Sequence, residues 1–129
     1  MFDESRGHTR DTFIWKGLDH KNATVRLFVP ERDHILDHHE HQMGMNFEAI
    51  YDSVTSPDEV YESGSFDNRE VFFKSSSLAT YHPKGFITKT VVEYNSERTE
   101  GFIVTAMPAK KVGGNVGVRT YPESDVRQE

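Results

Sequence analysis

The sequence predicts an α+β domain: N-terminal strands, one or two helices, and then an antiparallel sheet of three to four strands with the helices packed on one face. Three observations support this class. Two apolar segments open the chain, a polar segment with helical spacing follows, and β-branched and aromatic runs separated by turn residues fill most of the remainder. A chain of 129 residues is long enough for one domain with one modest core.

The first two strands are expected at residues 12–17 and 22–29. In the second of these, Val25, Leu27 and Val29 alternate with other side chains, which is the period of a strand with one buried face. Only a short polar connection separates the two segments, so the sequence predicts a hairpin.

A helix is expected from about residue 31 to 42. Pro30 suits the first helical turn, acidic residues follow it where they favour the helix dipole, and Gly44 is a suitable stop. A second helix is expected at 46–54, where apolar residues recur at helical spacing.

Strands are expected again in the second half of the chain, where Val, Ile, Phe, Tyr and Thr dominate. The expected segments are 58–63, 69–76, 85–94 and 101–108. We therefore expect a single domain at 12–110. Residues 1–11 and 111–129 are polar or glycine-rich and are expected to be flexible ends.

Composition excludes several classes of function. The chain has no cysteine, which excludes disulfides, thiolate zinc sites and a cysteine nucleophile and fits a cytoplasmic protein. No run approaches the roughly 18 apolar residues of a membrane helix, and the N-terminus lacks the apolar core of a signal peptide. A net charge of -6 argues against general affinity for nucleic-acid backbones but leaves room for a small basic cleft.

The segment DHILDHHEHQM holds four of the seven histidines. On a helix, His39 shares a stripe with Ile35 and Leu36, so His39 is the histidine expected to point toward the sheet. His34 and His38 are four residues apart and share a face.

Three interpretations of these histidines compete. They are ordinary solvated or core-edge residues, a metal site, or acid–base groups. An i, i+4 pair such as His34 and His38 can bind zinc or nickel, but the glutamate pattern of a metalloprotease helix and a second ligand cluster are absent from the sequence. No native metal and no cofactor are therefore expected.

Acid–base catalysis also needs a cation for a developing negative charge and a hydroxyl donor. The later strands and their connections supply candidates for these roles: Arg69, Lys74, Tyr81, Lys89 and Thr105. Each of them is, taken singly, more often an ordinary surface or strand residue.

The succession of motifs resembles the phage-associated nuclease domains of the barnase–EndoU–colicin–RelE superfamily. The resemblance rests on the HIL…H helix, the YDSVTSPDEVY segment, the strand ending FFK, the strand TKTVVEY and the strand GFIVTAMP, in this order. The matching residues are His34 and His39, Phe73 and Lys74, Val91 and Val92, and Thr105 with Ala106. His38 and Met107 depart from the pattern, since the family more often has a basic residue before the second histidine and an aromatic residue after the Thr-Ala pair.

The resemblance implies a metal-independent endoribonuclease of toxin or phage origin with its active site on the open side or edge of the sheet. It implies attack of an RNA 2′-hydroxyl on the adjacent phosphate, which leaves a 2′,3′-cyclic phosphate. His39 would lead the proton transfers with help from His34 or His38, Lys74 would stabilise the phosphorane and Thr105 would position the phosphate. The expected partners are an RNA substrate, contacted also by the candidates Arg69, Tyr81 and Lys89, and a cognate inhibitor protein.

Two other classes stay open. A small acidic α+β protein can be an immunity protein or antitoxin that neutralises a basic toxin with a charged face, and residues 57–70 are rich in carboxylates. The same fold can also serve as a phage-derived binding protein without catalysis.

Overall fold

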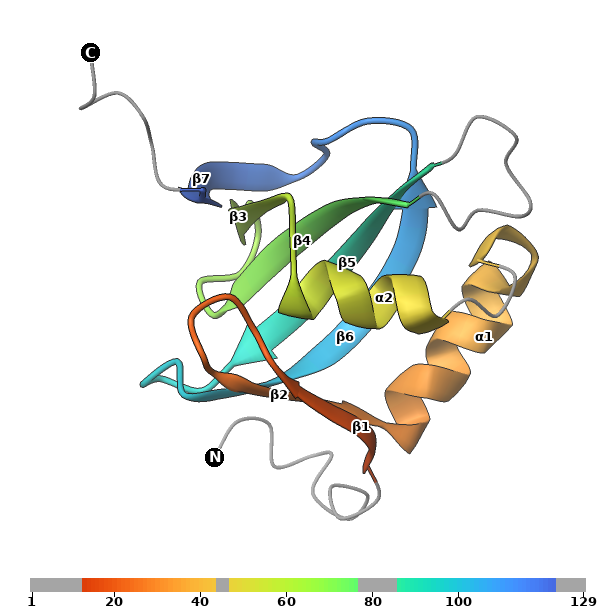
Figure 1. The fold of residues 1–129 in the computed structure, drawn as a ribbon, viewed down its shortest axis with the longest axis horizontal. Coiled ribbons are helices and arrows are strands. Elements are labelled where there is room, and N and C mark those ends of the chain that lie inside the picture. Colours follow the sequence, from red (N-terminus) through yellow and green to blue (C-terminus); the bar gives the residue numbers. More distant parts are fainter. Residues whose placement is uncertain (1–12, 44–46, 77–85, 123–129) are drawn as a thin grey trace.

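The computed structural model describes residues 13–43, 47–76 and 86–122. In these ranges the chain forms, in order, β1 (Phe13–Leu18), β2 (Thr24–Phe28), α1 (Val29–Met43), α2 (Phe47–Thr55), β3 (Glu59–Ser63), β4 (Arg69–Ser76), β5 (Phe86–Tyr94), β6 (Glu100–Ala109) and β7 (Val116–Tyr121). The α+β class and the mainly antiparallel sheet are confirmed, and each of these elements except β7 lies where the sequence predicts one (Figure 1). Neither of the two described helices is long and apolar enough to cross a membrane.

The described strands form one sheet in the order β1-β2-β6-β5-β4-β3-β7. All neighbours are antiparallel except β2 and β6, which run parallel. The sheet therefore has seven strands rather than the expected three to four. The N-terminal hairpin joins the same sheet because Thr24–Arg26 pair with Glu100–Phe102 at the start of β6.

The strand β7 lies in the segment expected to be a flexible tail, so that boundary is wrong. Its sequence VGVRTY has too little alternation to predict a strand, and half of its side chains are exposed while the others are partly buried. It forms because the edge of β3 is open to pairing: Tyr121 pairs with Val60, and Arg119 pairs with Tyr61. Backbone pairing, which leaves no clear pattern in the sequence, holds this edge strand in place.

The two faces of the sheet differ in what covers them. On the face that we call the helix face, Phe72, Val92 and Ile103 form one buried cluster with side chains of both helices, including Ile50 of α2 and Ile35 of α1. Figure 1 shows α2 lying across this face. The side chains that alternate with the cluster residues point to the other side of the sheet, which we call the opposite face.

Helix α1 lies beside β6 (Figure 1). The strand β2 pairs only with the first three residues of β6 and then passes directly into α1. The helix therefore flanks the later part of β6, and in the described ranges it contacts β6 more than any other strand. This arrangement places the histidine-rich helix at the flank of the central strands.

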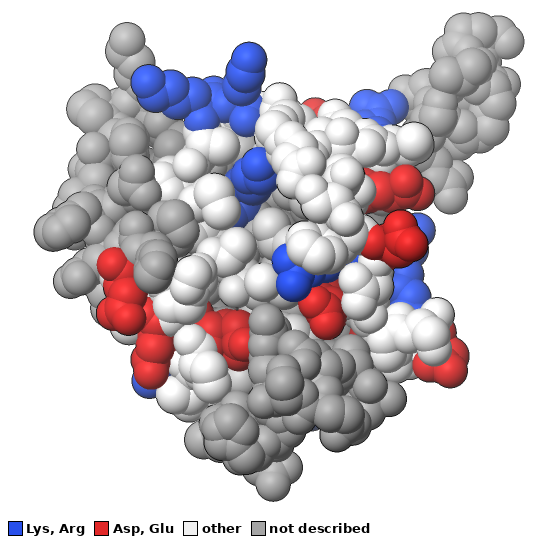
Figure 2. All heavy atoms as spheres, turned by 180° about the vertical axis from the view of Figure 1, so that it is seen from behind, with Lys and Arg blue, Asp and Glu red and all other residues white. Residues whose placement is uncertain are grey.

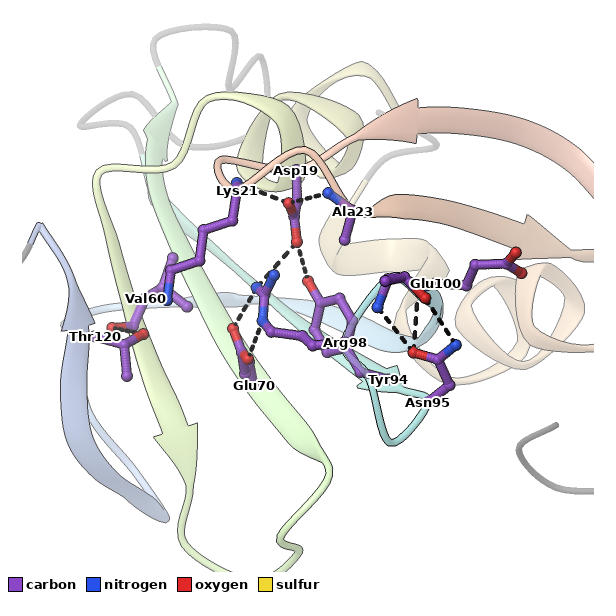
Figure 3. Close-up of polar contacts among 11 residues, drawn as sticks. Asp19, Lys21, Ala23, Val60, Glu70, Tyr94, Asn95, Arg98, Glu100 and Thr120 are labelled. Carbon is purple, nitrogen blue, oxygen red and sulfur yellow. Dashed lines mark hydrogen bonds and ion pairs between the residues drawn. The ribbon is translucent and has the colours of Figure 1, made fainter.

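A buried polar cluster ties the β1–β2 turn to the β5–β6 turn (Figure 3). The carboxylate of Asp19 accepts hydrogen bonds from the backbone N–H groups of Lys21 and Ala23 and from the Tyr94 hydroxyl at 2.6 Å, and it forms an ion pair with Arg98 at 3.0 Å. Arg98 also donates two hydrogen bonds to Glu70. Every group of the cluster has a partner, so we interpret it as structural.

Candidate functional site

Three rows of side chains on the opposite face bring several predicted site residues together. The register of β4, β5 and β6 places three residues across each row. The rows are Phe73–Lys89–Met107, Val71–Val91–Thr105 and Arg69–Glu93–Phe102. Three of the predicted site residues, Arg69, Lys89 and Thr105, thus share one face. Thr105 occupies the row between those of the two cations and is a diagonal neighbour of Lys89.

Arg69 is fixed in place by two contacts. Its Nε donates a hydrogen bond to Glu93 Oε1 at 3.1 Å, and its guanidinium lies over the ring of Phe66, 4.1 Å from the centroid. Glu93 is only 7% exposed, so this ion pair is partly withdrawn from water. A guanidinium group is planar, and its N–H donors form a fork that matches the oxygens of a phosphate or carboxylate ligand.

Lys89 lies on the same strand as Glu93, two rows away from Arg69. Its ammonium donates to the carbonyl oxygens of Gly113 at 3.2 Å and Gly114 at 2.9 Å, and it lies 5.9 Å from the ring centroid of Phe73. The cation therefore holds the β6–β7 connection against the sheet. The same connection carries the exposed residues Lys110 and Lys111.

Positive charge gathers on this part of the opposite face. Figure 2 shows Lys and Arg side chains along one rim, over the β6–β7 connection, with further basic groups in the middle of the face and acidic groups toward its flanks. A chain with a net charge of -6 thus concentrates cations over the strands that carry Thr105 and Lys89. Such a local field attracts anions despite the overall negative charge.

Thr105 lies in the middle row between the two cations. Its Oγ1 is buried and has no hydrogen-bond partner among the described residues. Buried hydroxyls without a partner are uncommon and destabilise the fold. A ligand oxygen that accepted this hydrogen bond would remove the penalty, so Thr105 is a candidate contact for a bound group.

Lys74 does not belong to this site. It pairs across β4–β5 with Thr88, one position out of phase with Phe73 and Lys89, and therefore lies on the helix face. Its ammonium is 3.6 Å from Asp58. The expectation that Lys74 and Thr105 open into the same cleft is wrong, because the FFK motif places the lysine next to the second phenylalanine and thus on the other side of the sheet.

The histidines are described only in part. His34 is exposed on α1, and the backbones of His38 and His39 continue the same helix. The side chains of His38 and His39, and the whole of Tyr81, lie outside the described residues, so their predicted roles stay predictions. Among the side chains that the structure describes, no three metal-ligating groups come together.

Sequence reasoning missed Glu93 and Phe66. The signal for Glu93 is present, because its position in TKTVVEY is four residues from Lys89 and thus on the same face of a strand. Phe66 lies in a polar connection between β3 and β4, where periodicity gives no information. The cross-strand register shows that Glu93 lies beside Arg69, and the contact between the guanidinium and the ring shows the same for Phe66.

Comparison with protein-family models, curated proteins and solved structures finds no match to this chain. The resemblance to the nuclease superfamily therefore stays a prediction from sequence motifs, and function is inferred from the side chains of the opposite face.

Proposed function

We propose that this protein binds single-stranded RNA on the opposite face of the sheet and cleaves it without metal, through attack of a 2′-hydroxyl on the adjacent phosphate. The observation that carries the proposal is that one face of the sheet holds, in three successive rows, Lys89, then Thr105, then Arg69 with the mostly buried carboxylate of Glu93. A cation, a hydroxyl donor and a general base are the groups that such chemistry needs.

The scissile phosphate is proposed to lie over Thr105. Lys89 is a diagonal cross-strand neighbour, at roughly 7–8 Å between backbones, which a long side chain spans easily. Thr105 donates its hydroxyl to a non-bridging oxygen, and Lys89 exchanges the carbonyls of Gly113 and Gly114 for the phosphorane charge. Met107 follows Thr105 on the same face, and its flexible side chain can move aside to admit the phosphate.

Glu93 is proposed to accept the proton of the 2′-hydroxyl. Its carboxylate lies two residues along β5 from the residue paired with Thr105. Arg69 holds this carboxylate in place through the 3.1 Å hydrogen bond. The proton for the leaving 5′-oxygen is assigned to the histidines of α1, with His39 as the leading candidate, on the ground of the sequence motif alone.

The test is incubation of the full-length protein with mixed single-stranded RNA in EDTA, followed by analysis of product ends. We expect 2′,3′-cyclic phosphates and a rate reduced about 10²–10⁴-fold in Glu93→Gln and in His39→Ala, as for loss of one proton-transfer group. A substrate with 2′-deoxyribose at the cleavage position is expected to stay intact, because it lacks the nucleophile. Cleavage of that substrate at a similar rate would refute the mechanism.

An inhibitor of a basic toxin is the second candidate. The observation that favours it is a set of exposed carboxylates on β3 and the connection that follows, namely Glu62 and Asp67. In that case the wild-type chain leaves RNA intact in EDTA and binds a basic protein, and Glu62→Lys with Asp67→Lys weakens this binding.

A further inference from the structure

The aromatic ring of Phe66 is 51% exposed, although it is large and apolar. One of its faces is covered by the guanidinium of Arg69, which also binds Glu93. We infer that Phe66 and Arg69 together form a stacking site for one unpaired nucleobase of the substrate. This inference rests on the proposed function and names the part of the RNA that this end of the site recognises.

The connection that carries Phe66 is held in a defined shape. The hydroxyl of Ser63 accepts hydrogen bonds from the backbone N–H groups of Ser65 and Phe66, at 3.1 and 3.2 Å. Asn115 donates to the Ser65 hydroxyl at 2.8 Å, and its carbonyl accepts from the N–H of Gly64 at 2.9 Å. The ring is therefore presented by a preorganised loop, so ordering it on binding loses little entropy.

Gly64 makes this close approach possible. A Cβ at this position would lie 2.6 Å from the side-chain oxygen of Asn115 and 2.9 Å from its backbone. The β3–β4 connection and the start of β7 thus support each other, and both support the exposed ring.

A nucleobase is the occupant that fits the surroundings. Every base has a π-face that stacks on an aromatic ring regardless of sequence, and an arginine in the stack adds a cation–π contribution. Thr105 lies two strands and one row of side chains from Arg69, roughly 12 Å between backbones at the usual strand and residue spacings. A base would then stack on Phe66 while the phosphate of a neighbouring nucleotide in the same strand reaches Thr105 and Lys89.

The test compares Phe66→Leu with Phe66→Tyr in binding of a short oligodeoxynucleotide that carries 2-aminopurine. The deoxy backbone lacks the attacking hydroxyl and stays intact, and the fluorescence of 2-aminopurine is quenched on stacking. We expect Phe66→Leu to lose about 5- to 100-fold in affinity together with the quenching, as for loss of one base–aromatic stack. Phe66→Tyr, which keeps the ring, is expected to match the wild type.

A matched oligomer with an abasic site separates stacking from a general effect on the face. It is expected to bind the wild type and Phe66→Leu equally, and the salt dependence of binding is expected to be unchanged, because no cation has been removed. Equal losses for the abasic and the intact oligomer, or wild-type affinity in Phe66→Leu, would overturn the stacking site while leaving RNA cleavage by the wild type untouched. A wild type that neither binds the oligomer nor cleaves RNA would overturn both.

Discussion

Replacement of Asp19 by asparagine is expected to destabilise the fold by about 3–5 kcal/mol, the usual result of breaking a buried, paired charge. The side chain is fully buried, and its two oxygens accept three hydrogen bonds and form an ion pair with the donor groups of Arg98. Whichever way the amide of an asparagine is turned, its NH₂ group meets two of these donors. The loss is a large part of the roughly 5–15 kcal/mol that stabilises a typical domain.

Urea unfolding measures this loss. With a slope of about 1–3 kcal/mol/M, Asp19→Asn is expected to lower the midpoint by roughly 2 M. The matched control is Glu100→Gln, which breaks a pair with Arg26 at 3.3 Å in which Glu100 is more than half exposed, and which is expected to cost less than about 1 kcal/mol. Equal midpoints for the two variants would refute the role of the buried cluster.

The same carboxylate makes stability depend on acid. Burial opposes ionisation of Asp19, but hydrogen bonds from Tyr94 and the backbone, together with Arg98, outweigh it and lower the pKa below 3.8. A depressed carboxyl pKa means that its stabilisation is present above pH 3.8 and is lost as the pH falls further. This acid-dependent loss is expected to be absent from Asp19→Asn when unfolding is measured from pH 5 to 2.

Three further perturbations test other parts of the fold. Burial lowers the pKa of His20, whose ring nitrogens have no hydrogen-bond partner among the described residues. The contribution of neutral His20 to the free energy of unfolding is therefore complete above pH 6.5 and decreases as the pH falls. His20→Phe is expected to weaken this pH dependence of stability in urea titrations. Phe72→Ala removes a fully buried ring from the core and is expected to cost about 3–5 kcal/mol by the same measurement. Lys89→Met frees the carbonyls of Gly113 and Gly114, so amide exchange in that connection is expected to rise while the global free energy of unfolding changes by less than about 1 kcal/mol. Unchanged exchange would contradict the role of Lys89 in holding this connection.

Much of the fold could be predicted from sequence because its elements carry strong local patterns. The segments at 69–76, 85–94 and 101–108 alternate or are rich in β-branched residues, and all three form central strands. The strand β7 could not be predicted in this way, because an exposed edge strand is selected by the partner edge rather than by its own composition. The parallel pairing of β2 with β6 joins segments more than 70 residues apart and leaves no local signal.

The candidate site could be predicted only in part for the same reason. Residue types selected Arg69, Lys89 and Thr105 as candidates, and the register places these three on one face, while their roles stay predictions. Motif matching placed Lys74 with them, but the face of a strand residue depends on its parity relative to its neighbours, and a shift of one position moves a side chain across the sheet. Glu93 became a candidate site residue only from its hydrogen bond with Arg69, which the sequence does not reveal.

The measurement that tests the central claim most directly is the RNA cleavage rate of Thr105→Val compared with Thr88→Val. Both hydroxyls are buried, and neither has a hydrogen-bond partner in the part of the chain that the structure describes. Thr88 lies on the helix face, while Thr105 lies on the opposite face. Valine has the same shape and removes only the unpaired hydroxyl, so both variants are expected to fold at least as stably as the wild type. If the opposite face is the site, Thr105→Val loses about 10²–10³-fold in rate and Thr88→Val keeps the wild-type rate. Wild-type cleavage by Thr105→Val, or an equal loss in both variants, would contradict the proposed site.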